Sequence, residues 1–369
     1  MDLEREYNNR ALVPDHPAYF ARWQKDSDFV RATLPCTLDL AYGPDPRHRL
    51  DWFPAAGPAR GTLLFIHGGY WRSLDKSMFS WLAASYVPAG LNVALLNYRL
   101  CPAVRIDDIV DDVVDGVNWL VGNAGSSPLR DGPVVVSGHS AGGHLVGALF
   151  AAPRERLQFD PSRIVGGVSL SGLFDFEPLS RHSFNADFHL DAAAVERLNL
   201  HDKPTTVKSP LVIAAGGEES SEFQRQSRLI AESWKPQVES LLMLPAINHF
   251  SIVDGFAERS QPLHERTLAL FQGAQLRPED FRGLDRPLTV ELGTAGAPLT
   301  VHLAVESVDP LPPHRMRGAP FSVVLRGPRE PLLPQATHAL LHPSLGRVDV
   351  FLVPIAQDAQ AARYEATFN

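Results

Sequence analysis

A serine framed by two glycines, each two residues away, is the strongest chemical signal in the sequence. Residues 138–142 read Gly-His-Ser-Ala-Gly and stand directly between the apolar run Pro133–Ser137 and a helical pattern. A serine hydroxyl is a weak nucleophile, so a catalytic serine is presented on a tight strand-to-helix turn where a base can reach it. The alternative is a glycine-rich turn whose serine only caps a helix. Because the pattern stands between a strand and a helix, we predict that Ser140 is a nucleophile.

A glycine-rich loop is the second signal. Residues 67–71 read His-Gly-Gly-Tyr-Trp and follow the apolar run Thr62–Ile66. Attack on a carbonyl produces an oxyanion, and backbone N–H groups aimed at it supply about 3 kcal/mol or more. Taken alone the loop is typical of a strand-ending turn, but its pairing with the serine motif favours an oxyanion hole. The predicted donors are the N–H groups of Gly69, Tyr70 and Ala141, with Gly68 as the alternative if the loop is rotated by one residue.

A hydrolase that uses such a serine needs a carboxylate and a histidine later in the chain. The run Leu211–Ala215 ends in Gly-Gly-Glu-Glu, and the following run, Ser240–Leu244, leads to His249. An acid after one strand and a histidine after the next would both reach the serine. His249 is therefore the predicted general base, and a carboxylate would fix its tautomer and stabilise the imidazolium.

The identity of that carboxylate stays open at this point. Glu219 and Glu218 compete for the role, and one of them could simply be favoured near a helix N-terminus. Asp175 is a possible acid in a variant arrangement. Asp254 follows His249 too closely along the chain to be the first choice.

The elements that would position these residues alternate between short β-branched runs and helical patterns. Most of the runs are continuously apolar, as in a sheet covered on both faces. The predicted strands are Leu50–Pro54, Thr62–Ile66, Asn92–Asn97, Val134–Ser137, Val165–Ser169, Leu211–Ala215 and Ser240–Leu244. Helices are predicted over Ser77–Val87, from Ile106 to Leu120, and over Gly142–Ala151, Glu222–Trp234 and His264–Phe271. This alternation predicts an α/β fold with a mostly parallel sheet flanked by helices.

The composition changes near the C-terminus. Residues 277–369 hold 12 of the 31 prolines but none of the lysines or tryptophans. The change predicts a boundary near Gly273 to Pro278, with units at 1–275 and 276–369. Short alternating runs predict a small β-sandwich or barrel after one helical turn at Pro278–Phe281. Its predicted strands are Leu288–Leu292, Leu299–Val305, Phe321–Arg326, His338–Leu341, Val348–Val353 and Arg363–Phe368.

Charge and composition exclude several classes of protein. The chain has 34 basic and 42 acidic residues, a net charge of −8, and no Lys/Arg run, which disfavours binding to nucleic acid or an anionic membrane. Hydrophobic residues make up 44%, enough for a sizeable core, but no apolar run approaches the ~18 residues of a membrane span. Only Cys36 and Cys101 are present, so neither a disulfide framework nor a structural zinc site is expected. The charged N-terminus lacks a signal pattern, which favours the cytoplasm.

Several motifs together resemble one family. From residue 1 to about 272 the chain resembles the α/β-hydrolase family that contains kynurenine formamidase (arylformamidase). The resemblance rests on the two glycine-rich motifs above and on Tyr7-Asn8-Asn9-Arg10, Ser171-Gly172-Leu173-Phe174-Asp175, residues 219–227 and Asn248-His249-Phe250. In the family the acid immediately precedes the Ser-x-Glu-Phe stretch, which implies Glu219 rather than Glu218. Members closer to the vertebrate enzymes have Asp there, so Glu is a departure.

The resemblance implies hydrolysis of N-formyl-L-kynurenine to kynurenine and formate, without a metal or other cofactor. Trp71, Phe174 and Phe250 would then bind the substrate, although aromatic residues near a core are more often packing residues. A broad carboxylesterase is the alternative, because one fold serves many esters and amides. A non-catalytic binding protein on the same scaffold is disfavoured by the intact Ser-His-carboxylate order. Residues 277–369 resemble a small bacterial domain of uncharacterised function, which would serve as a structural module or as a surface for a homo-oligomer or protein partner.

Overall fold

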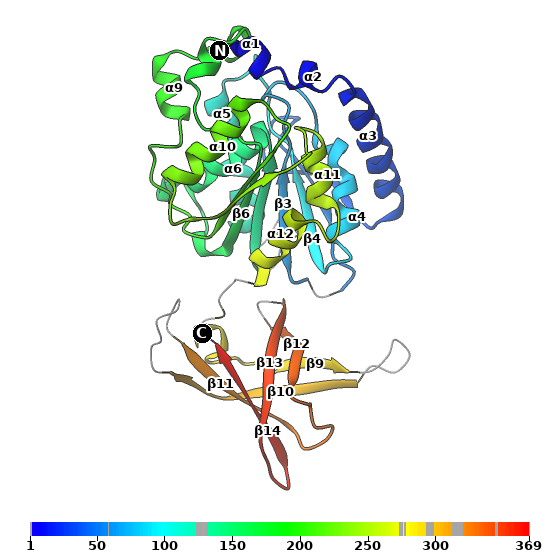
Figure 1. Ribbon diagram of the computed structural model, residues 1–369. Coiled ribbons are helices and arrows are strands. Elements are labelled where there is room, and N and C mark those ends of the chain that lie inside the picture. Colours follow the sequence, from blue (N-terminus) through cyan, green and yellow to red (C-terminus); the bar gives the residue numbers. More distant parts are fainter. Residues whose placement is uncertain are drawn as a thin grey trace. The chain divides into compact units, whose positions relative to one another are not determined.

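The computed structural model describes residues 2–57, 59–122, 128, 132–272, 276, 278–292, 299–311, 320–343 and 346–368. The chain divides into two compact units, Met1–Phe271 and Gln272–Asn369 (Figure 1). The first holds the residues that the sequence predicts to be catalytic and is named the catalytic unit, and the second is named the barrel unit. The boundary predicted between residues 275 and 276 falls beside residues 273–275, which lie outside the described part of the chain.

The catalytic unit is built on one eight-stranded sheet with the order β1-β2-β4-β3-β5-β6-β7-β8. From β4 to β8 every neighbouring pair is parallel, whereas β1 and β2 are antiparallel additions at one edge. The α/β fold and the seven predicted strands are confirmed, and β1 is an eighth strand that the apolar runs did not indicate. The strands are β1 (Thr37–Ala41), β2 (Arg49–Phe53), β3 (Gly61–Ile66), β4 (Leu91–Leu96), β5 (Val134–His139), β6 (Ile164–Leu170), β7 (Leu211–Gly216) and β8 (Val238–Leu244).

Helices cover both faces of this sheet. Successive side chains of a strand point to opposite faces, and Leu64 and Ile66 of β3 lie in one apolar cluster while Leu63 and Phe65 lie in another. The first cluster is completed by α5 (Ile106–Val117), α6 (Ala141–Phe150), α9 (Ala192–Leu198) and α10 (Ser221–Ser233). The second is completed by α3 (His16–Thr33), α4 (Ala83–Tyr86), α11 (Ser251–Ala257) and α12 (Pro262–Gln272).

Shorter helices complete the unit. These are α1 (Leu3–Glu6), α2 (Asn9–Leu12), α7 (Glu177–Ser180) and α8 (Asn185–Phe188). The helix predicted over Ser77–Val87 is instead a 3₁₀ helix, Lys76–Leu82, followed by the single turn of α4. None of the described helices combines the length and apolar character that crossing a bilayer requires.

The barrel unit is a closed antiparallel barrel with the order β10-β11-β14-β13-β12-β9, which decides between the sandwich and the barrel that the sequence allowed. Its core takes alternate residues of each strand, for example Val301 and Leu303 of β10, while His302 between them is exposed. The helical turn α13 (Pro278–Phe281) precedes the barrel. The strands are β9 (Leu288–Leu292), β10 (Leu299–Pro310), β11 (Phe321–Pro328), β12 (Ala336–His342), β13 (Gly346–Gln357) and β14 (Ala361–Phe368).

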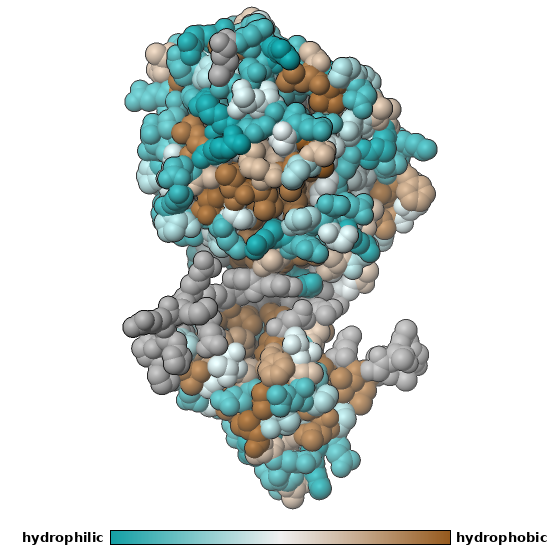
Figure 2. All heavy atoms as spheres, viewed as in Figure 1, coloured by the Kyte–Doolittle hydropathy of each residue, from teal (hydrophilic) through white to brown (hydrophobic). Residues whose placement is uncertain are grey.

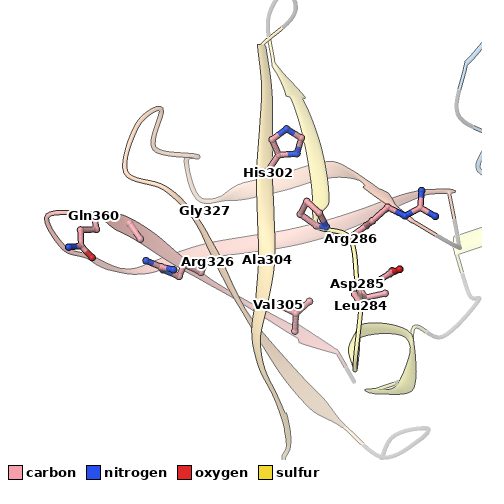
Figure 3. A pocket seen from close by; sticks show the side chains of 11 residues that line it. Leu284, Asp285, Arg286, His302, Ala304, Val305, Arg326, Gly327 and Gln360 are labelled. Carbon is pink, nitrogen blue, oxygen red and sulfur yellow. The ribbon is translucent and has the colours of Figure 1, made fainter.

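An open groove of about 550 Å³ runs across the outside of this barrel. Arg326 and Gln360 lie on one side of β10 and Arg286 on the other, with His302 above (Figure 3). The cationic groups therefore do not converge on one point of the groove.

On the face shown in Figure 2, apolar residues gather near the middle of the catalytic unit and in smaller groups elsewhere on both units. Phe29 and Leu38 are the large exposed hydrophobic residues among the described part of the catalytic unit, and Leu299, Leu332, Phe351 and Ile355 are those of the barrel unit. Scattered apolar residues of this kind are normal on folded domains.

Candidate active site

Ser140 stands on the turn between β5 and α6, as the sequence predicted. Its backbone has φ 56° and ψ −116°, a left-handed conformation that side chains rarely adopt. The flanking glycines are required by space. A Cβ on Gly142 would lie 2.0 Å from the carbonyl oxygen of Ile66, and one on Gly138 would lie 2.3 Å from that of Gly142. The Gly-x-Ser-x-Gly spacing thus lets helix α6 begin directly against β3 and allows the tight turn that carries Ser140.

The glycine-rich loop after β3 passes directly over this serine. A Cβ on Gly68 would lie 3.0 Å from Cβ of Ser140, and one on Gly69 would lie 2.2 Å from the carbonyl oxygen of Ser73. Gly69, Tyr70 and Trp71 all have positive φ, at 107°, 52° and 54°. Only glycine fits at positions 68 and 69, and the loop consequently packs against Ser140 through bare backbone.

Backbone donors are available beside the serine. Among the described residues, the backbone N–H groups of Gly69 and Tyr70 donate no hydrogen bond to another backbone group. The carbonyl oxygen of Gly69 accepts a hydrogen bond from the N–H group of Arg72. Ala141 is the first residue of α6, and the N–H groups of a first helical turn have no acceptor inside the helix. The predicted oxyanion-hole donors are therefore all free to bind a developing negative charge.

Glu219 and His249 form a buried pair at the same edge of the sheet. Glu219 follows β7 and His249 follows β8, and His249 Nδ1 lies 2.7 Å from Glu219 Oε2. The other carboxylate oxygen, Oε1, accepts hydrogen bonds from Ser171 Oγ and from the Gly216 N–H, both at 2.6 Å. The side chains are 0% and 5% exposed. Because Glu219 accepts at Oε2, His249 carries its proton on Nδ1 and leaves Nε2 as the basic nitrogen.

The other candidate carboxylates lie elsewhere. Glu218 is exposed. Asp175 is ion-paired with Arg225 at 2.9 Å. Asp254 accepts from Arg22 at 2.6 Å and from the Trp23 indole at 3.0 Å. Of the four carboxylates considered from the sequence, Glu219 is the one that contacts His249.

His249 packs against the residue that precedes the serine. His139, the residue before the nucleophile, approaches the His249 carbonyl oxygen with its Nε2 at 2.8 Å, and the two rings are 4.7 Å apart. Phe223 packs edge-on against the His249 ring at 4.6 Å. Ser140 Oγ and His249 Nε2 are not hydrogen-bonded in this structure, and such bonds are often long until a substrate is bound.

Comparison with known proteins identifies the fold family. A family described as "alpha/beta hydrolase fold" matches residues 63–225, and a domain of unknown function matches residues 276–368. The crystal structure of a putative thioesterase from Silicibacter sp. is 32% identical, with a TM-score of 0.65, and the match covers 71% of this chain and 97% of that one. The chain belongs to the α/β-hydrolase family. Esterase B from Lactobacillus Rhamnosis shows the same fold at 17% identity, with a TM-score of 0.54.

Curated relatives of this hydrolase include kynurenine formamidases. The Danio rerio protein is 23% identical over 270 residues, which cover 69% of this chain and 88% of that protein. The Drosophila melanogaster protein is 23% identical over 201 residues, and this chain spans 66% of its length. With the α/β-hydrolase match, these relatives make the protein a serine hydrolase. Its resemblance to the formamidase family is confirmed, and the barrel unit is a separate domain.

Two residues that support this hydrolase's site were not assigned a role from the sequence. Ser171 has φ 52° and hydrogen-bonds Glu219 across 48 positions of sequence. Tyr7 is fully buried, donates its hydroxyl to Glu222 at 2.7 Å, and accepts at its carbonyl from the Tyr70 hydroxyl. Burial raises the pKa of Tyr7, so the hydroxyl keeps its proton. The signal that could have found Ser171 is its place just after β6, at the same sheet edge as the other site residues.

The three aromatic residues predicted to bind substrate are packed inside the catalytic unit. Trp71 and Phe174 are both 0% exposed and belong to one core cluster, and Phe250 is 5% exposed and packs against Phe20 and Trp23 of α3. The partly buried aromatic pair beside the loop is instead Tyr70 and Phe184, whose rings are 4.9 Å apart.

Arg72 anchors the segment that carries Phe184. Its guanidinium lies 4.0 Å from the Phe184 ring centroid and 2.6 Å from Asp187.

Among the described side chains, no group of three or more His, Cys, Asp or Glu residues could hold a metal ion.

Proposed function

We propose that this serine hydrolase cleaves an aryl formamide such as N-formyl-L-kynurenine, giving kynurenine and formate. The observation that carries the proposal is the match to kynurenine formamidases over most of the catalytic unit, joined to a buried Glu219–His249 pair that contacts His139, the residue before Ser140. A formyl group is the smallest acyl group. It suits a nucleophile that is only 2% exposed and that has the backbone of Gly68 packed against it.

The proposed reaction uses the geometry as follows. Ser140 Oγ attacks the formyl carbon while His249 Nε2 takes its proton, and Glu219 stabilises the resulting imidazolium. The oxyanion accepts hydrogen bonds from the N–H groups of Gly69, Tyr70 and Ala141. The C–N bond then breaks, and the arylamine leaves with the proton from His249. Water, deprotonated by His249, attacks the formyl-serine ester and releases formate.

A carboxylesterase activity is the second candidate. It is favoured by the match to a probable isoprenylcysteine alpha-carbonyl methylesterase from Arabidopsis thaliana, 30% identical over 157 residues and covering 36% of that protein. An ester needs the same nucleophile, base and oxyanion hole, but its leaving alcohol requires less help from the protonated histidine than an amine does.

A substrate comparison tests the proposal. The full chain is assayed with N-formyl-L-kynurenine and with p-nitrophenyl acetate and butyrate, each with and without a serine-directed sulfonyl fluoride. We expect kcat/KM for the formamide to exceed that for either ester at least tenfold, and the inhibitor to abolish both activities. Ester turnover equal to or faster than formamide turnover would assign the carboxylesterase instead. Turnover of neither substrate, or turnover that survives serine modification, would overturn the mechanism.

A further inference from the structure

A second cavity lies in the catalytic unit, away from Ser140. It has a volume of about 260 Å³ and is enclosed by α5, α6 and the stretch from the end of α9 to Lys203. The residues of α5 and α6 that line it follow helical spacing, so one face of each helix is left uncovered toward the cavity. Its floor is apolar and buried, formed by Val114, Ala148, Leu198 and Leu200.

The rim of this cavity is charged, and one cation differs from the others. Arg197 is paired with Asp107 through contacts of 3.1 and 3.2 Å, and Arg156 is paired with Asp111 at 2.9 Å. Lys203 has no carboxylate partner among the described residues. Its ammonium group donates to the backbone carbonyl of Arg197 and is partly buried. An ammonium group has three N–H donors, so two remain for a ligand.

A buried polar side chain also lines the cavity. His144 is 0% exposed, and its ring nitrogens make no well-formed hydrogen bond, although the backbone carbonyl of Leu198 lies near the ring. Burial lowers the pKa of His144 to about 3, partly opposed by the nearby Leu198 carbonyl, so the ring is neutral and presents one donor and one acceptor.

We propose that this cavity binds a small monocarboxylate with an apolar body, of the size of benzoate or hexanoate. The carboxylate contacts Lys203, and the ring or chain covers the apolar floor beside His144. The volume is just below the usual range of about 300–1,000 Å³ for pockets that hold drug-sized ligands, which fits a single ring or a short chain. The paired arginines keep the rim close to neutral, so the unpaired Lys203 decides the sign of the ligand.

The site is separate from the nucleophile but adjacent to it in the fold. His144 lies on α6, its backbone N–H donates to the Ser140 carbonyl at 3.1 Å, and its ring meets the edge of Trp71 at 5.4 Å. None of the residues assigned to catalysis lines the cavity.

Calorimetric titration of the full chain at low ionic strength tests the proposal, with benzoate as the probe and benzamide as its uncharged counterpart. We expect one benzoate per chain and at least tenfold weaker binding of benzamide. Lys203→Met should weaken benzoate binding tenfold or more. Lys208→Met is the matched control, because Lys208 is exposed five residues further on and does not line the cavity. It should leave benzoate binding unchanged.

A second variant locates the ligand independently of charge. Ala148→Leu places extra carbon atoms on the cavity floor and should abolish benzoate binding. Thermal unfolding is recorded for each variant, and if Ala148→Leu does not fold, the two lysine variants decide alone. Absence of benzoate binding, or equal binding by wild type and Lys203→Met, would overturn the proposal, the latter because the ligand would then occupy another site such as that at Ser140.

Discussion

The catalytic unit and the barrel unit both enclose an apolar core, but they bury different polar groups with it. The catalytic unit buries several serines, carboxylates and histidines, among them Ser140, Glu219 and His249. The buried polar residues in the described part of the barrel are Ser322, His338 and His342. The two barrel histidines bond through Nε2 to backbone carbonyls, of Pro334 and Asp280. Burying ionisable groups is costly unless they are paired, so the unit that gathers them is the one where chemistry is expected.

Strand direction explains why the groups gather in one unit. Parallel strands all end at the same edge, so β5, β6, β7 and β8 place Ser140, Ser171, Glu219 and His249 together. In an antiparallel barrel, consecutive strands end at opposite rims, and residues that follow neighbouring strands are separated by the length of the barrel. In this protein the parallel topology brings one residue from each of several consecutive strands to the same edge of the sheet.

The largest expected effect is the loss of the nucleophile. Ser140→Ala should lower kcat by about a million-fold on the better of the formamide and ester substrates, because the members of a triad act as a unit. Stopped assays over long times measure the residual rate, and circular dichroism checks that the fold is intact. A folded Ser140→Ala variant with nearly wild-type activity would mean that Ser140 is not the nucleophile and that the buried polar groups of the catalytic unit do not mark the active site.

The next effect separates the two adjacent glutamates. Glu219→Gln should lower kcat roughly 10⁴-fold, because the imidazolium loses its charged partner. Glu218→Gln is the matched control and should change kcat by less than about twofold, since Glu218 is exposed. Glu219→Asp should recover part of the lost activity if the role is carried by charge. Equal and mild losses from both glutamine variants would move the acid to another residue.

Acid should unfold the catalytic unit before the barrel. Burial lowers the pKa of His67 to about 4, that of His144 to about 3, and that of His139 well below its ordinary value. These folded pKa values lie below the unfolded value of about 6.5, so the unfolded chain takes up protons first. The stability from the neutral rings is complete above pH 6.5 and is lost as the pH falls toward 4.

Tryptophan fluorescence can follow this unfolding selectively, because all six tryptophans lie in the catalytic unit. Melting temperatures are measured from pH 7.5 to 4.5 for the full chain and for a barrel fragment beginning at Gln272. Within the described barrel, burial lowers the pKa of His342. A catalytic unit that melts at the same temperature at pH 7.5 and pH 5 would contradict the prediction.

The smallest expected effect comes from removing the barrel. A chain that ends at Gln275 should keep kcat within about twofold of the full chain, because every proposed catalytic residue precedes that point and the catalytic unit has its own core. The barrel fragment should show no hydrolysis. Loss of all activity in a folded truncated chain would show that the barrel completes the site.

The sequence predicted much of the fold because apolar runs mark buried strands. The edge strand β1 was not predicted because its side chains are mostly exposed and form no apolar run. The placement of Ser140 after one strand and of His249 after a later one was predictable from local patterns, whereas the preference for Glu219 over Glu218 as the predicted acid needed the family resemblance. Ser171 and Tyr7 were not assigned a role because their contacts reach across 48 and 215 positions. Trp71 and Phe174 were predicted to bind substrate because they stand beside motifs, but both are core residues. Sequence position alone does not distinguish an aromatic ring in a binding site from one in the core.

The left-handed backbone at position 140 favours glycine for stability, whereas the proposed catalysis requires serine there. A non-glycine residue held in such a conformation costs of order 1–3 kcal/mol, and glycine would adopt it without that cost. Ser140→Gly should therefore unfold at a higher temperature than Ser140→Ala, although both variants should be inactive. Relaxed selection on activity would let glycine drift into position 140, so a serine retained there in related sequences marks a lineage in which turnover is still under selection.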